Sequence, residues 1–389
     1  MDALGRLLRA GRRPREEAAQ APRRFLFLVP SRAEGERSAR LCADLAREAA
    51  AGAGAGQEAV RLVVLDGGDA SAAAAVARSG AEVLVKEPPG PHKGAVLEWA
   101  VATVDRDRPG FLDSFDAVVV LDADLRLPAG WLAELKVPPG AEAFQCPVRG
   151  DGPPPPGAAR AEAFSLAAAL RVDDPGRDAA GLPVRLRGKA MGFSPRAFRL
   201  GPARATRTTA EDTEATLLLL EAGIRVRSLP GPEALEERAA PGRLAGARAR
   251  WLGGHLALLL RRPRLIAGLL ARRPRAALSL LLDVYLRPRA LTLALVSGVL
   301  AASGVLWAAS AVQGRGPGLL PGAAALGATA LGAEALHARR ARRVLGVTPE
   351  VPPVTASDLA RMAAVWTRAA ARGLLSPGAW HRGRDAGSG

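Results

Sequence analysis

Short apolar runs alternate with amphipathic stretches over the first 150 residues of the chain. The runs are typical of buried strands and cover residues 25–29, 60–65, 82–85, 117–121 and 143–147. The stretches between them have helical periodicity and cover residues 36–49, 70–78 and 93–104. This order predicts an α/β domain with a mostly parallel sheet that is covered by helices.

Ionisable residues follow the ends of these predicted strands, namely Glu34, Asp66, Lys93, Asp122 and Asp124. Because ligands of open α/β sheets bind beyond the carboxyl ends of the strands, we expect these side chains to share one edge. Asp122 and Asp124 suit a divalent cation, since Mg²⁺ is commonly held by one or two carboxylates together with substrate phosphates. Taken alone, the pair also fits an ordinary strand end or turn.

The composition narrows the class of partner. A formal charge of +16 and a pI near 11.3 suit either nucleic acid or an anionic membrane surface. Aromatic residues make up only 4% of the chain, and no helix-turn-helix, zinc-finger or RNA-recognition pattern is visible, so we expect no nucleic-acid partner. Cys42 and Cys146 lie far apart without metal-ligand spacing, which predicts reduced thiols.

Two long apolar runs lie towards the C-terminus. Residues 290–312 carry no charge, and residues 318–336 carry only Glu334, so the pair predicts a transmembrane helical hairpin. Two buried core helices are the alternative. Arginines crowd both outer flanks, whereas the turn between the runs has only Arg315, which places both termini in the cytoplasm. We therefore expect a multi-pass protein of the cell membrane with a cytoplasmic catalytic domain.

Several short motifs occur in a characteristic order. They are Val29-Pro30-Ser31-Arg32-Ala33-Glu34, Val63-Val64-Leu65-Asp66-Gly67-Gly68, Lys93-Gly94-Ala95, Asp122-Ala123-Asp124 followed by Pro128, Glu211-Asp212 and Arg250-Trp251. In this order the chain resembles the family 2 glycosyltransferases, and it looks like their membrane-bound branch, which includes cellulose synthase, hyaluronan synthase and ceramide glucosyltransferase relatives.

The resemblance implies a GT-A type, Rossmann-like sheet and a division of the chain into five parts. These are a basic arm (1–24), a GT-A catalytic domain (25–245), interfacial helices (246–289), the transmembrane hairpin (290–336) and a cytoplasmic tail (337–389). The arm fits either a basic amphipathic helix on a membrane surface or a solvated, partly disordered segment.

The resemblance also implies roles for the residues at the sheet edge. Asp66 corresponds to an aspartate that holds the nucleotide, and Lys93 to a lysine near the diphosphate, while Glu34 belongs to the donor side. Asp124 would bind Mg²⁺ or Mn²⁺ directly and Asp122 would support it, so that the cation neutralises charge on the departing diphosphate. Asp66 next to two glycines also fits a simple turn, and Lys93 a solvated helix start.

Two further motifs are implied to act on the acceptor side. Asp212 would be the catalytic base, with Glu211 beside it at the acceptor, although both carboxylates also fit a helix cap. Arg250 would meet the diphosphate and Trp251 would stack on an acceptor sugar. Trp251 also fits an anchor at the membrane interface. Ala33, Leu65 and Ala247 depart from the family pattern.

The function implied is an inverting glycosyltransferase. It would move a sugar from a nucleotide-sugar to a lipid or glycan acceptor at the cytoplasmic membrane face, in contact with membrane lipids. Two alternatives stay open from the sequence. One is a catalytically degenerate, membrane-anchored protein that binds nucleotide-sugar or glycan, and the other is a basic scaffold whose acidic pairs are caps and turns.

Overall fold

The computed structural model describes residues 24–52, 57–238, 244–286, 298–305 and 320–375, together with residues 296 and 307. Residues 1–23 of the expected arm and most of the apolar run at 290–312 lie outside this part of the chain, whereas Arg24 already belongs to the first strand.

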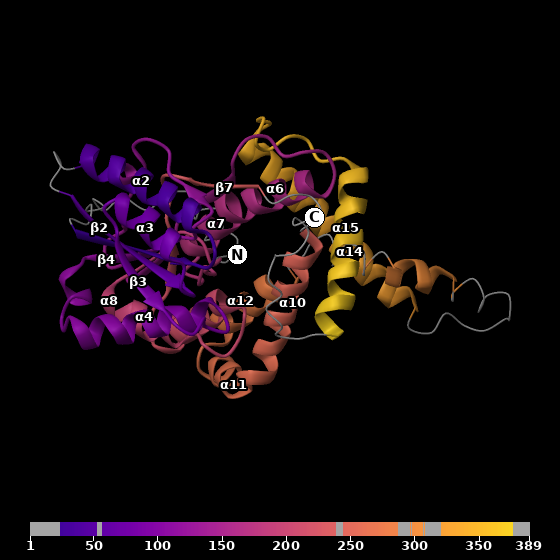
Figure 1. Ribbon diagram of the computed structural model, residues 1–389. Coiled ribbons are helices and arrows are strands. Elements are labelled where there is room, and N and C mark those ends of the chain that lie inside the picture. Colours follow the sequence, from indigo (N-terminus) through magenta and orange to yellow (C-terminus); the bar gives the residue numbers. More distant parts are fainter. Residues whose placement is uncertain are drawn as a thin grey trace.

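A mixed sheet of seven strands forms the centre of the described molecule (Figure 1), in the order β3-β2-β1-β4-β8-β6-β9. Its strands are β1 (Arg24–Ser31), β2 (Glu58–Asp66), β3 (Glu82–Lys86), β4 (Ala117–Val120), β6 (Ala143–Gln145), β8 (Met191–Phe193) and β9 (Val226–Ser228). In this sheet β8 runs antiparallel to β4 and β6, and the other neighbouring pairs are parallel. The expected mixed, mostly parallel sheet is confirmed.

Alternating side chains of β1 show why the sheet is covered on both faces. Leu26 and Leu28 belong to one hydrophobic cluster, while Phe25, Phe27 and Val29 belong to another, as expected for side chains that alternate between the faces of a strand. All five are at most 3% exposed, so neither face of this strand meets water.

The described helices are α2 (Gly35–Gly52), α3 (Ala70–Arg78), α4 (Lys93–Asp107), α5 (Trp131–Glu134), α6 (Ala158–Ala168), α7 (Asp174–Ala179), α8 (Pro195–Leu200), α9 (Glu211–Glu221), α10 (Leu244–Arg261), α11 (Pro263–Arg272), α12 (Pro274–Leu286), α14 (Leu320–Leu345) and α15 (Ala356–Leu375). Short helical turns lie at Leu112–Ser114, Ala169–Asp173 and Pro202–Arg204.

The two faces of the sheet are covered by different helices. Helices α2, α3 and α5 contribute apolar residues to the cluster around Phe25 and Phe27. Helices α4, α8 and α9, with parts of α10, α11 and α12, contribute to the cluster around Leu26 and Leu28. Figure 1 shows α2 and α4 on opposite sides of the sheet.

A second, small sheet joins segments that are distant in sequence. It consists of β5 (Leu125–Arg126), β10 (Ala234–Glu236) and β7 (Val148–Gly150), in the order β5-β10-β7. Glu236 pairs with Leu125, and the backbone N–H of Glu237 donates to the carbonyl of Asp124 at 3.1 Å. This sheet therefore holds β10 directly beside the Asp122-Ala123-Asp124 segment.

The C-terminal helix α15 packs on α10 and α6, and Figure 1 shows α10 and α15 side by side. Met362 and Val365 of α15 share a small hydrophobic cluster with Ala161 and Leu244. The start of α15 is fixed by Asp358, whose carboxylate accepts a hydrogen bond of 2.6 Å from the backbone N–H of Gly157. The tail segment thus lies against the described helices of the sheet domain.

The expected multi-pass membrane arrangement is wrong for the described chain. None of the helices within the described residues is long and apolar enough to span a bilayer. The second apolar run forms part of α14, which also contains Glu334, His337 and several arginines. The same helix continues into a segment whose Ala341 and Leu345 are buried against Ala167 and Ala168 of α6. A long, mostly apolar run in the sequence therefore does not by itself distinguish a packed helix from a membrane span.

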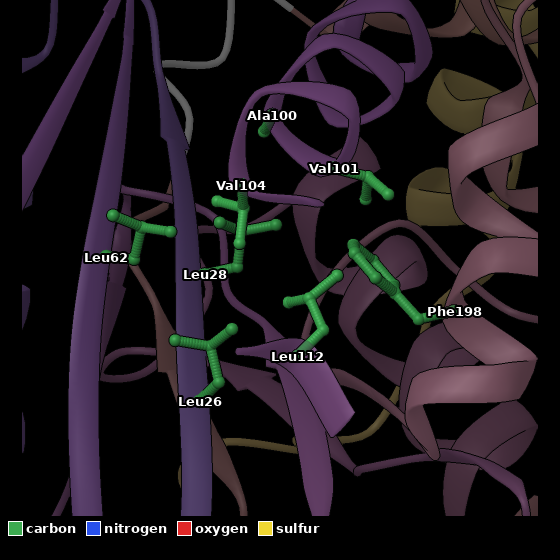
Figure 2. Close-up of a pocket in the computed structure, with 8 residues that line it drawn as sticks. All are labelled: Leu26, Leu28, Leu62, Ala100, Val101, Val104, Leu112 and Phe198. Atoms are coloured by element: carbon green, nitrogen blue, oxygen red, sulfur yellow. The ribbon is translucent and has the colours of Figure 1, made fainter. Parts of the chain in front are cut away.

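A cavity beneath the sheet is too small and too apolar to be a substrate site (Figure 2). Its volume is about 10 Å³, which is at the lower limit for one water molecule. Only apolar side chains line it, namely Leu26, Leu28, Leu62, Ala100, Val101, Val104, Leu112 and Phe198. It is a packing gap in the core, and the polar chemistry lies at the edge of the sheet.

Candidate active site

Asp66 is fixed at the end of β2 by two contacts. Its carboxylate accepts a hydrogen bond of 2.6 Å from the backbone N–H of Gly90 and lies 3.2 Å from the Arg32 guanidinium. Arg32 in turn donates to the carbonyl of Gly90 at 2.9 Å. Asp66 is only 5% exposed, so these contacts give it one defined orientation. Arg32 was not singled out from the sequence.

Glu34 follows β1 at the same edge. It pairs with Arg37 at 3.1 Å, and Arg37 also contacts Glu237 at 3.0 Å. Because Glu237 is bonded to the backbone of Asp124, this chain of contacts links the segment after β1 to the segment after β4.

Asp122 and Asp124 follow β4 and point to different lysines. Asp122 pairs with Lys93, whose ammonium also donates to the carbonyl of Gly188 at 2.5 Å. Asp124 lies 3.6 Å from Lys189 through one carboxylate oxygen. Its other oxygen, Oδ1, is buried and accepts no hydrogen bond from any residue that the structure describes.

The Asp124 carboxyl group is in an unfavourable setting for a charge. Burial raises its pKa to about 6, and although Lys189 opposes the shift, Asp122 and Glu236 add to it. A buried acceptor without a donor, surrounded by other carboxylates, is a position where a cation would be stabilised.

Buried carboxylates on α2 hold the segment after Asp124. Asp44 accepts from the backbone N–H of Leu127 at 3.1 Å and from Arg126 at 2.7 Å. Glu48 accepts from the backbone N–H of Leu132 at 3.2 Å. Both acids are 3% exposed, so they fix the position of the chain that leaves the carboxylate pair.

Glu211 and Asp212 are the first two residues of helix α9, and they lie close to Gly94 and Gly188, the neighbours of Lys93 and Lys189. A Cβ added at Gly188 would lie 3.6 Å from Asp212 Oδ2, and one added at Gly94 would lie 3.2 Å from Glu211 Cβ. Asp212 Oδ1 accepts from the backbone N–H of Thr213 at 2.6 Å. Burial and the neighbouring Asp212 raise the pKa of Glu211 to about 7, against the effect of Lys93.

Helix α10 packs on the beginning of α9. His255 Nε2 lies 3.1 Å from the Thr213 hydroxyl, and Gly254 sits against Ala210, where an added Cβ would lie 2.9 Å from its backbone nitrogen. Trp251 is one helical turn before these residues on the same side of α10, and it is 42% exposed. The helix therefore carries an exposed indole one turn before the residues that contact the start of α9.

Arg250 is not brought into the carboxylate cluster by any contact. It makes no hydrogen bond or ion pair with another described residue. The guanidinium over the Trp251 ring belongs to Arg248, at 4.0 Å from the ring centroid. Arg248 is 5% exposed and also lies 5.4 Å from the Trp366 ring of α15. The roles implied for Arg250 at the diphosphate and for Trp251 at an acceptor sugar stay predictions.

Lys189 and Glu236 are members of the cluster that the sequence did not reveal. They pair with each other, and Lys189 adds the contact to Asp124. One signal was available: only four of the chain's 54 basic residues are lysines, and two of these, Lys93 and Lys189, lie in this cluster. Nothing in the local pattern around Glu236 pointed to it, because its place depends on the pairing of β10 with β5.

The described residues contain no group of three or more His, Cys, Asp or Glu side chains arranged to hold a metal ion. A cation at this edge would therefore depend on one or two carboxylates and on ligands from a bound substrate, which is the usual arrangement for Mg²⁺ with phosphates. The two-carboxylate segment with the orphaned Asp124 oxygen fits that requirement.

Close packing around Gly94 leads to a test of how the site is assembled. An added Cβ would lie 1.9 Å from the carbonyl oxygen of Ala205, so Gly94→Ala must shift the start of α4 and with it Lys93. We expect a loss of roughly 1–3 kcal/mol in the free energy of unfolding, measured with urea. Gly176→Ala in α7 is the matched control, because nothing lies within 4 Å of that position. It should be neutral or stabilising by up to about 1 kcal/mol. Equal stability of Gly94→Ala and the control would contradict this packing.

Comparison with known proteins identifies the fold. No family model and no curated protein matches the chain. Among solved structures it is similar to a mannosyltransferase from Pyrobaculum calidifontis in complex with GDP-Man and Mn²⁺, at 19% identity and a TM-score of 0.54, covering 96% of this chain and 93% of that chain. At this identity the similarity shows a shared mixed α/β fold and carries no role for this chain by itself.

Two other similarities are weaker. Mannosyl-3-phosphoglycerate synthase from Rubrobacter xylanophilus is 18% identical with a TM-score of 0.42, covering 67% of this chain and 84% of that one. Glucosyl-3-phosphoglycerate synthase from Mycobacterium tuberculosis, in complex with Mn²⁺, uridine diphosphate and phosphoglyceric acid, is 20% identical with a TM-score of 0.38, covering 64% and 84%.

Proposed function

We propose that this chain is a glycosyltransferase that uses a nucleotide-sugar donor and a divalent metal, Mg²⁺ or Mn²⁺. The observation that carries the proposal is the gathering of Asp122, Asp124, Glu211 and Asp212 around two lysines at the carboxyl edge of the sheet. The shared fold with a mannosyltransferase that was solved with GDP-Man and Mn²⁺ supports it.

The donor side of the proposed site has three parts. Asp66, held by Arg32 and Gly90, would bind the nucleoside, because its fixed carboxylate can accept hydrogen bonds from a base or ribose. Asp124, supported by Asp122, would hold the metal, which when bound supplies positive charge against the diphosphate. Lys93 reaches Asp122 and would lie near the same phosphates.

On the acceptor side, Asp212 is the proposed general base. It would take the proton from the acceptor hydroxyl as that oxygen attacks the anomeric carbon opposite the diphosphate, in one displacement that inverts the configuration. Glu211 neighbours Asp212 at the start of α9, and Trp251 offers an exposed ring on which an acceptor sugar can stack. The acceptor class proposed is a lipid or a glycan.

A donor screen tests the function directly. Purified protein would be incubated with Mn²⁺ and a panel of GDP-, UDP- and other nucleotide-sugars, and the released nucleoside diphosphate would be measured. We expect release from one donor class, dependent on the metal and increased by an added acceptor extract. Failure to release diphosphate from every donor, together with failure to bind GDP or UDP with Mn²⁺, would contradict the proposal.

A further inference from the structure

The loop that carries Lys189 has an unusual backbone. Gly188 has φ +77° and Ala190 has φ +47°, so residues on both sides of Lys189 adopt the left-handed region. That region is uncommon for alanine and persists where the surrounding structure enforces it. The Gln145 side-chain amide provides such a restraint, because it donates to the Lys189 carbonyl at 2.7 Å and to the Cys146 carbonyl at 2.8 Å.

This loop directs the Lys189 ammonium into a group of carboxylates contributed by different parts of the fold. Lys189 pairs with Glu236 of β10 and lies 3.6 Å from Asp124 Oδ2, and Asp122 follows the same strand as Asp124. About a quarter of each of the three paired side chains is exposed, so they are only partly screened by water.

The two contacts of Lys189 are unequal. Its pair with Glu236 is a direct hydrogen bond, whereas 3.6 Å to Asp124 exceeds hydrogen-bond distance and is a charge contact. The ammonium can therefore leave Asp124 while keeping Glu236. Removing the lysine charge would leave Asp124 and Glu236 without the cation between them, and such like charges favour the arrival of another cation.

We infer that Lys189 is a resident counter-ion for Asp124 that competes with the divalent metal for this carboxylate, with Glu236 as the partner that retains the lysine when the metal binds. This inference rests on the metal site of the proposed function. It assigns Lys189 and Glu236 to tuning metal affinity, and it predicts opposite effects of removing the one or the other.

Titration of the purified full chain with Mn²⁺ alone, by calorimetry at constant pH and ionic strength, tests the inference. Lys189→Met should bind Mn²⁺ on the order of tenfold more tightly than the unmodified chain, since one competing charge is lost. Glu236→Gln should bind it more weakly, because Lys189 then has Asp124 as its main partner. Lys136→Met is the matched control, as it removes an exposed lysine elsewhere, and its affinity should stay unchanged.

The inference would be overturned if Lys189→Met and the unmodified chain bound Mn²⁺ with the same affinity, or if neither of them bound it. Weaker binding by Lys189→Met would overturn it as well. If circular dichroism shows that Lys189→Met does not fold, the Mn²⁺ affinity of Glu236→Gln is the test. Unchanged or tighter Mn²⁺ binding by Glu236→Gln would then contradict the proposed competition between Lys189 and the metal. The titration contains no sugar donor. Mn²⁺ binding that changes in these variants as expected, in a protein that neither releases diphosphate from any donor nor binds GDP or UDP, would therefore contradict the proposed function while leaving this inference standing.

Discussion

Asp212→Asn is expected to keep its fold and to lose sugar transfer by roughly 10²–10⁴-fold in kcat, because asparagine cannot accept the proton of the acceptor hydroxyl. The amide oxygen can still accept the hydrogen bond that Asp212 Oδ1 receives from Thr213, so the start of α9 should stay intact. The KM for the donor should change little, since the residue would act on the acceptor. Steady-state kinetics with the donor found in the screen would measure both values.

Asp107→Asn is the matched control for this variant, because Asp107 is an exposed acid at the end of α4 that pairs only locally with Arg106. It should transfer sugar at the original rate. If Asp212→Asn also kept that rate while its melting temperature fell, Asp212 would be a structural residue of the helix start and the proposed base would be wrong.

Asp124→Asn should abolish most of the metal-dependent transfer, with a loss of about 10²–10⁴-fold in kcat/KM, since a metal at the departing phosphate is worth several kcal/mol. Raising the Mn²⁺ concentration should restore little of it. Asp151→Asn removes an exposed carboxylate on the neighbouring loop and serves as the control. Unchanged transfer and Mn²⁺ dependence in Asp124→Asn would exclude Asp124 as the metal ligand.

The same variant has a second, activity-independent readout. The folded-state pKa of Asp124 is raised from 3.8 to about 6, so the carboxyl group binds its proton more tightly in the folded than in the unfolded chain. Without metal, its contribution to stability is therefore most favourable below about pH 4 and declines as the pH rises to about 6. Asp124→Asn removes this decline. Its melting temperature, relative to the unmodified chain, should be higher at pH 7.5 than at pH 4.

The strands and helices near the site were predictable because their signals are local. Runs such as 117–121 are apolar and end abruptly in carboxylates, and the structure places β4 at Ala117–Val120 with Asp122 and Asp124 directly beyond it. In open α/β folds, ligands bind beyond the carboxyl ends of the strands. This rule predicted that Lys93 and Asp122 share one edge of the sheet, and the two side chains form an ion pair there.

Other parts depend on contacts between distant segments, which a local pattern does not contain. Glu236 reaches Asp124 only because β10 pairs with β5, and Lys189 reaches it only because Gln145 holds a left-handed loop. Arg248 lies over the Trp251 ring and also near Trp366 of α15, a contact that depends on the packing of α15 on α10. The membrane hairpin failed for a related reason, since hydropathy does not show that α14 packs on α6.

Anomalous scattering from crystals grown with Mn²⁺ and the nucleoside diphosphate selected by the screen tests the central claim most directly. We expect a manganese peak about 2 Å from an Asp124 carboxylate oxygen, with the diphosphate on its other side and the nucleoside at Asp66. A peak at another part of the surface, or a nucleotide bound away from the carboxyl edge of β1, β2 and β4, would contradict it.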